Sequence, residues 1–232
     1  MANWFLGRAL AEEAEAENAP WSFLGEGAAF WVTVAVLLVV GVAVYLVTRK
    51  KSSKKSFWTA KTMAVGAMCM ALSSVLSLIK LWPMPMGGSV TPASMLPLLL
   101  FAYCYGTAPG MVLGALYGVM QFLLDGMAWA ALGAIPNLLD YPIAFGLLGL
   151  AGCFRGSKAK MTAGFVLGCF GRFMASFLSG FIFYGQYAPE GVNPVWYSLT
   201  YNGSYMLVEC IICIALGLLV GERLAKELKK VA

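Results

Sequence analysis

Long runs of apolar residues, separated by short polar segments, repeat along almost the whole chain. A helix needs about 20 apolar residues to cross the hydrocarbon core of a bilayer, and runs of this kind occupy most of the sequence. Hydrophobic residues make up 60% of the 232 residues and charged ones 12%, whereas soluble domains have about 45–50% and about 25%. We therefore expect an all-α integral membrane protein with about seven spanning helices and no large soluble domain.

The first apolar run, from Ala28 to Val47, stands apart from the other six. It is too long for the apolar core of a signal peptide and no basic residue directly precedes it, so we interpret it as an extra N-terminal transmembrane helix. The other runs predict a six-helix bundle, with helices near 60–80, 94–106, 109–125, 138–153, 162–185 and 196–220. The helix near 94–106 is short and follows Pro92, so we expect it to be partly irregular or packed inside the bundle.

These runs divide the chain into four parts. They are an extracellular acidic tail (1–27), the extra helix with its basic linker (28–58), a six-helix substrate-binding domain (59–222) and a basic tail (223–232).

Lysine and arginine gather in three segments that each flank an apolar run: 49–61, 155–160 and 223–230. The positive-inside rule places such segments in the cytoplasm, and six alternating crossings after the linker return both later segments to that side. The loops left outside, 81–93, 126–137 and 186–195, have no basic residue. We therefore expect a multi-pass protein of the plasma membrane with its C-terminus in the cytoplasm and its N-terminus outside.

Several classes of function have no support in the sequence. There is no Walker-type loop for ATP, and without any histidine no Ser-His or Cys-His pair can form for nucleophilic catalysis. The Cys-x-x-Cys spacing of Cys210 and Cys213 lies in an apolar run, where two small buried side chains are a better interpretation than a zinc or redox site. We expect no enzyme activity, no metal and no cofactor bound by this chain.

Three ionisable residues, Asp140, Arg172 and Glu209, lie inside predicted membrane helices, where charges are costly and usually functional. Asp140 is expected at the outer start of its helix, because Pro142 fits a first turn. A carboxylate at that place also faces the positive end of the helix dipole. Asp140 is therefore either a helix cap or an anionic group in a pocket open to the outside.

Three tyrosines in the last apolar run, Tyr197, Tyr201 and Tyr205, are spaced four apart and share one helix face. Asn202 adds an amide at membrane depth. Aromatic walls with a few polar groups indicate a pocket for a small polar-aromatic ligand, and aromatic faces attract a cation. An interfacial aromatic belt is the alternative.

Small residues recur along the helix near 60–80, at Ala60, Ala64, Ala67 and Ala71. Such spacing lets two helices approach closely. The partner is either another helix of this chain or a second subunit.

Five stretches resemble the thiamine-specific S-component of energy-coupling factor transporters, in the right order over about 59–222: Met86–Thr91, Ala93–Pro97, Leu138–Phe145, Tyr187–Gly191 and Tyr197–Leu207. The resemblance implies a six-helix bundle that captures thiamine on the outer face with high affinity. It also implies docking on a transmembrane coupling subunit and two cytoplasmic ATPases, which hydrolyse the ATP. Ala67 and Ala71 match the small residues that contribute to docking in the family.

The resemblance also implies the ligand site. Family members carry Glu or Asp before a tyrosine in the fourth helix, and an aromatic residue, often Trp, eight residues after a histidine in the fifth. Ser176 replaces that histidine here. The implied ligand-binding residues are Asp140, Tyr141, Ser176, Tyr184, Tyr197 and Asn202.

Thiamine fits these residue types, because its thiazolium is a fixed cation that Asp140 can neutralise while Tyr184 and Tyr197 stack and Asn202 reads the pyrimidine edge. Three alternatives remain open at this point. The same fold could bind a thiamine precursor or another heteroaromatic vitamin, with Ser176 as the reason. The chain could be a solitary proton-coupled carrier using Asp140 or Glu209, or a membrane anchor without a ligand.

Overall fold

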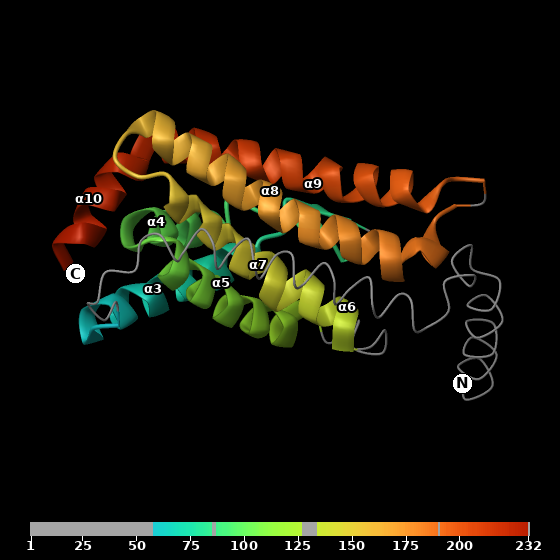
Figure 1. Cartoon of the computed structure of the whole chain (residues 1–232), viewed down its shortest axis with the longest axis horizontal. Helices are drawn as coiled ribbons and strands as arrows, with labels where there is room; N and C mark the ends of the chain where they lie inside the picture. The colour runs from blue at the N-terminus through green and yellow to red at the C-terminus, as the bar shows by residue number, and fades with distance from the viewer. Residues whose placement is uncertain (1–57, 85–86, 127–133, 190, 232) are drawn as a thin grey trace.

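The computed structural model describes residues 58–84, 87–126, 134–189 and 191–231, which form a helical bundle with one small hairpin (Figure 1). The helices and strands are α3 (Ala60–Leu78), β1 (Trp82–Pro83), β2 (Ser89–Val90), α4 (Leu96–Tyr105), α5 (Thr107–Gln121), α6 (Ala134–Leu138), α7 (Ala144–Leu147), α8 (Lys158–Phe183), α9 (Pro194–Leu216) and α10 (Glu222–Val231). The predicted acidic tail and extra helix lie outside the described residues.

Several of these helices join into longer rods. A π-helical turn, Phe122–Gly126, extends α5. The π-helical turn Leu139–Ile143 joins α6 to α7, and the 3-10 turn Leu148–Cys153 completes that rod. A further π-helical turn, Gly217–Gly221, joins α9 to α10. Five helical stretches of the described residues are thereby long and apolar enough to cross a membrane, with α4 as a shorter apolar helix.

The helix starts follow from local capping. Thr59 and Thr62 form a reciprocal capping box at the start of α3. Ser157 accepts a hydrogen bond from the Lys160 amide and so caps α8. Asn193 does the same for α9, where Pro194 occupies the first helical position and needs no hydrogen-bond partner.

The short helix α4 is packed inside the bundle, as one of the two sequence-based expectations proposed. Every residue from Leu96 to Cys104 is buried. The helix lies against α3, α5, α10 and the 3-10 turn Leu148–Cys153. Because α4 meets protein on all sides, its uniformly apolar sequence has no polar face.

Glycines bring α5 against the rod formed by residues 134–153. A Cβ atom on Gly114 would lie 2.2 Å from the Phe145 carbonyl oxygen, and one on Gly118 would lie 2.4 Å from that of Tyr141. Backbones can come this close only where there is no side chain. This contact fixes the position of the π-helical turn that carries Asp140 and Tyr141.

The expected helix start at Asp140 and Pro142 needs correction, and two further segments have more structure than the sequence indicated. The fourth helix begins at Ala134, not near 138, so Asp140 is not at a helix start and the cap interpretation is wrong. Pro142 lies inside the helix, where its missing N–H and its ring disrupt regular α-helical bonding and a wider π turn accommodates it. The predicted loop 81–93 contains the β1–β2 hairpin, and the tail after 222 is helical.

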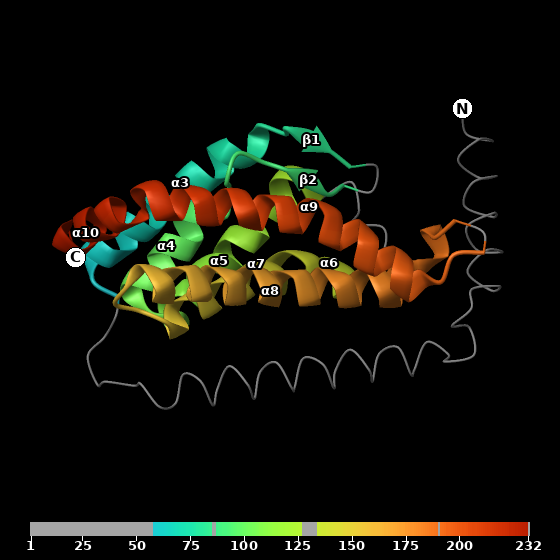
Figure 2. The ribbon, with the colours of Figure 1, turned by 90° about the horizontal axis from the view of Figure 1, so that it is seen from above.

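The hairpin lies beside α9 (Figure 2). Trp82 pairs with Val90 and Pro83 with Ser89 in antiparallel register. α8 and α9 run side by side in both views, and α10 turns across the end of the bundle at which α3 starts (Figures 1 and 2). The hairpin, α8 and α9 thus stand around a common interior space.

Candidate ligand-binding cavity

One cavity lies between the hairpin, α3, α5, the 134–153 rod, α8 and α9. Its empty volume is about 1060 Å³, open solvent included. All six residues that the sequence assigned to ligand binding line it: Asp140, Tyr141, Ser176, Tyr184, Tyr197 and Asn202.

Asp140 is half-buried in the wall of this cavity and is surrounded by hydroxyl groups. The Ser179 hydroxyl donates a 2.7 Å hydrogen bond to its Oδ2. The hydroxyls of Ser176 and Tyr184 also interact with the carboxyl group. Among the described residues, none of the ion pairs involves Asp140. We name Asp140, Ser176, Ser179 and Tyr184 the Asp140 cluster; because no ion pair among the described residues engages its carboxylate, the cluster can accept a cationic ligand.

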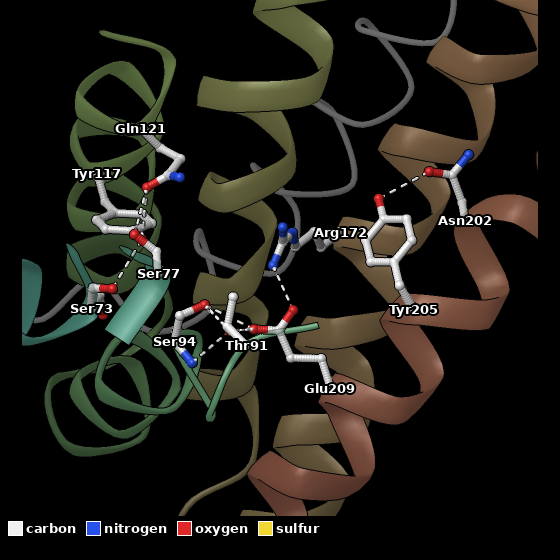
Figure 3. A network of polar contacts seen from close by, with 10 residues as sticks. All are labelled: Ser73, Ser77, Thr91, Ser94, Tyr117, Gln121, Arg172, Asn202, Tyr205 and Glu209. Carbon is white, nitrogen blue, oxygen red and sulfur yellow. Dashed lines mark hydrogen bonds and ion pairs between the residues drawn. The ribbon is translucent and has the colours of Figure 1, made fainter. Parts of the chain in front are cut away.

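The tyrosines of α9 form a continuous aromatic wall, as their spacing predicted. The ring centroids of Tyr197 and Tyr201 are 5.9 Å apart and those of Tyr201 and Tyr205 are 6.0 Å apart. The Tyr205 hydroxyl donates to Oδ1 of Asn202 at 3.0 Å, which holds the buried amide in place (Figure 3). Asn202 in turn donates from Nδ2 to the Ser198 carbonyl at 3.1 Å.

The close approach of α8 and α9 depends on a glycine. A Cβ atom on Gly180 would lie 2.4 Å from the Ser198 hydroxyl and 3.0 Å from Nδ2 of Asn202. Gly180 therefore leaves room for the α9 polar groups, one turn beyond Ser176 along α8. Sequence reasoning missed Gly180 because nothing in an apolar helix singles out one glycine among several.

A second carboxylate, Glu209, is 1% exposed and lies in a different environment. Its Oε1 accepts hydrogen bonds from the hydroxyls of Thr91 and Ser94. Its Oε2 is 3.8 Å from Nη1 of Arg172 (Figure 3). The Arg172 guanidinium also lies over the Phe145 ring, with 4.1 Å from Cζ to the ring centroid. We name Glu209, Arg172, Thr91 and Ser94 the Glu209 cluster. The sequence singled out its two charges but not their pairing, which depends on how α8 packs on α9.

The opposite wall, between α3 and α5, carries polar groups that sequence reasoning missed. Gln121 Oε1 accepts hydrogen bonds from Ser77 at 3.2 Å and from Tyr117 at 3.0 Å (Figure 3). Lys80 and Asp125 form an ion pair at 2.8 Å. A signal was available, because Tyr117, Gln121 and Asp125 are spaced four apart in an otherwise apolar run and so share one helix face.

The two alanines assigned to docking lie elsewhere. Ala67 and Ala71 are exposed on α3 and do not line the cavity. Within the described residues, no group of three or more Cys, Asp or Glu side chains is arranged to hold a metal ion. The polar groups that line the cavity are carboxylates, hydroxyls, the side-chain amides of Gln121 and Asn202, and the guanidinium of Arg172.

Comparison with known proteins identifies relatives of most of the part of the chain that the structure describes. A family model for thiamine transporter protein (Thia_YuaJ) matches residues 63–228. The thiamine transporter ThiT of Bacillus subtilis is 38% identical over 144 residues, which cover 56% of this chain and 73% of that protein. ThiT of Lacticaseibacillus paracasei is 31% identical over 170 residues, covering 66% and 81%.

A solved structure shares the fold. ThiT from Listeria monocytogenes matches with a TM-score of 0.62 at 20% identity, covering 73% of this chain and 96% of that one. The expectation of an all-α membrane bundle is therefore confirmed, and so is the resemblance stated from the sequence. The family consists of transporters, which also confirms that the chain is not an enzyme. This multi-pass membrane protein belongs to the thiamine transporter protein family.

Proposed function

We propose that this chain captures thiamine with high affinity in the cavity described above and passes it inward with the help of partner ATPases. The observation that carries the proposal is the Asp140 cluster, whose carboxylate forms no ion pair among the described residues, in a cavity walled by tyrosines. Thiamine is a fixed cation with an aromatic pyrimidine, and both properties match that cavity.

Five of the residues assigned to ligand binding would divide the recognition between them. Asp140 would neutralise the thiazolium or accept from the aminopyrimidine. The rings of Tyr141, Tyr184 and Tyr197 would supply stacking surface. Asn202, held by Tyr205, would offer its amide to the pyrimidine edge.

In this proposal the energy for delivery comes from partner ATPases, since the sequence has no Walker-type loop of its own. We propose that a transmembrane coupling subunit docks on the exposed small-residue face of α3, at Ala67 and Ala71, and that two cytoplasmic ATPases complete the importer. The basic segments place the C-terminus in the cytoplasm in this scheme, and the N-terminus outside.

The first test is a titration of the purified full chain with thiamine, where we expect tight saturable binding. Absence of thiamine binding at millimolar concentration would contradict the capture proposal. The docking proposal needs a separate test with Ala67→Trp and Ala71→Trp. We expect both variants to bind thiamine normally, to lose the co-purifying ATPases and to abolish uptake, whereas wild-type co-purification would place the docking face elsewhere.

A second candidate function keeps the cavity and changes the ligand. Ser176 is buried beside Asp140 at the position where relatives are expected to carry histidine, so a stacking surface is replaced by a small hydroxyl. Such a cavity would favour a thiamine precursor or another heteroaromatic vitamin. Competition of the free aminopyrimidine against thiamine distinguishes the two ligands, because the second candidate requires the precursor to bind more tightly.

A further inference from the structure

The segment between the hairpin and α4 contains an unusual backbone conformation. Ala93 has a φ of +67° and is 1% exposed, and it is the one residue other than glycine with positive φ among those that the structure describes. This left-handed conformation is strained for alanine, because it crowds Cβ against the following carbonyl oxygen. The surrounding structure must therefore hold the turn in place.

The turn has few backbone bonds of its own. The Ala93 amide donates to the Thr91 carbonyl at 2.8 Å, and the Leu96 amide donates to the Ala93 carbonyl at 3.0 Å. The Ser94 amide donates to the Thr91 hydroxyl at 3.2 Å. The side chains on either side of Ala93 thus take part in forming the turn.

The side chains of Thr91 and Ser94 both form hydrogen bonds with the Glu209 carboxylate. The hydroxyls of Thr91 and Ser94 lie at the same carboxylate oxygen, Oε1, while Oε2 faces Arg172 (Figure 3). All three residues of this contact are at least nine-tenths buried, so water does not compete for these bonds. A charge-assisted hydrogen bond in such surroundings is stronger than a neutral one.

The turn fixes the part of the hairpin that touches the cavity. Thr91 directly follows β2, and Gly88, which directly precedes β2, donates from its amide to the Tyr201 hydroxyl at 3.4 Å. A Cβ atom on Gly88 would lie 2.8 Å from the Tyr205 ring, so this backbone rests directly on the tyrosine wall. A displacement of the 91–94 turn would therefore lift Gly88 from the tyrosines.

We infer that Glu209 is a positioning residue: its carboxylate clamps the strained 91–94 turn from α9 and thereby holds the hairpin backbone against the tyrosine wall of the cavity. The clamp keeps a bound ligand in the cavity by keeping that wall in place. The effect of the clamp on a bound ligand rests on the proposed function, whereas the clamp itself does not.

The clamp is tested in ligand-free, full-length protein by hydrogen exchange of the amides of 87–95. We expect exchange to rise about tenfold in Glu209→Gln, the effect of one lost charge-assisted hydrogen bond. Thr91→Val combined with Ser94→Ala, which leaves the glutamate in place, should give a similar rise. Glu227→Gln, the same change at an exposed glutamate of α10, should leave the exchange unchanged.

Ala93→Gly provides the rescue. Glycine adopts positive φ without steric cost, so adding this change to Glu209→Gln should slow the exchange severalfold again. Exchange that is unchanged in Glu209→Gln, or not slowed by the added glycine, would overturn the clamp. None of these outcomes depends on thiamine, so they stand apart from any failure of the proposed function.

The consequence for the ligand is tested by the thiamine dissociation rate. We expect dissociation to be about tenfold faster in both Glu209→Gln and the Thr91→Val/Ser94→Ala double variant. If only Glu209→Gln is affected, Glu209 acts on the ligand by its charge or through Arg172, and the positioning role is wrong.

Discussion

The Asp140 cluster and the Glu209 cluster each place a carboxylate in the same cavity, yet the two carboxylates differ in their partners. Glu209 is almost fully buried and is matched by two hydroxyls and the Arg172 guanidinium. Asp140 is half-buried and is surrounded by hydroxyls, with no ion pair among the described residues. A buried charge that is paired makes the fold sensitive to the loss of its partner, whereas a carboxylate without an ion pair is available to a cationic ligand.

The largest expected effect is a loss in the free energy of unfolding when the Glu209 cluster is disrupted. Arg172→Met removes the cation and leaves a buried carboxylate without charge compensation, so we expect a loss of about 3–5 kcal/mol in the free energy of unfolding. Reversible unfolding in detergent measures it. Lys158→Met is the matched control: its pair with Glu222 has the same 3.8 Å distance but is exposed, so its loss should cost less than about 1 kcal/mol. Equal losses in the two variants would contradict the comparison.

The next effect is on binding at the Asp140 cluster. Asp140→Asn keeps size and hydrogen-bonding capacity but removes the charge, so thiamine affinity should fall by about 1.5–3 kcal/mol, or about tenfold to a hundredfold. Calorimetric titration measures this, and stability should change little. Asp125→Asn is the control, because Asp125 also lines the cavity but already pairs with Lys80. An unchanged affinity in Asp140→Asn would remove the main reason for placing the cation there.

A smaller effect is expected from the hydroxyl that orients Asp140. Ser179→Ala removes the 2.7 Å hydrogen bond to Oδ2, while Ser176 and Tyr184 still interact with the carboxyl group. We expect thiamine affinity to fall severalfold, by about 1 kcal/mol. Ser204→Ala, whose exposed hydroxyl bonds only to the Tyr201 carbonyl, should bind like the wild type. A hundredfold loss in Ser179→Ala would mean that the serine itself contacts the ligand.

The smallest expected effect comes from Ser176→His, which restores the residue expected from the family resemblance. If the cavity is fitted to thiamine, affinity should hold or rise by less than about tenfold, since an added aromatic contact is worth about 0.5–1.5 kcal/mol. The same titration measures it. A sharp loss of affinity would show that the space around Ser176 fits a different ligand.

Sequence reasoning placed the apolar helices and the tyrosine wall, because both depend on spacing within one segment. The i, i+4 spacing of Tyr197, Tyr201 and Tyr205 determines a shared face in any helix. The ligand-binding roles of the six assigned residues stay predictions, although all six line one cavity.

The features that were missed depend on contacts between segments or on backbone detail. The two strands of the hairpin have two residues each, too few for a periodic pattern. The wrong start of the fourth helix came from assigning Pro142 to a first turn, whereas a π turn accommodates it in the interior. The left-handed Ala93 could not be anticipated, because alanine gives no sign of positive φ.

The buried helix α4 has a consequence for how the protein is made. Its ten residues span about 15 Å, about half of the roughly 30 Å hydrocarbon core, and the segment before it is not helical. Non-helical backbone is tolerated at membrane depth only when protein or a water-filled space covers it. We therefore expect the translocon to release this crossing into lipid only after the later elements that cover α4, which are α5, the 134–153 rod and α10, have been synthesised. Glycosylation mapping of chains truncated before α8 would show whether the crossing is already inserted at that stage.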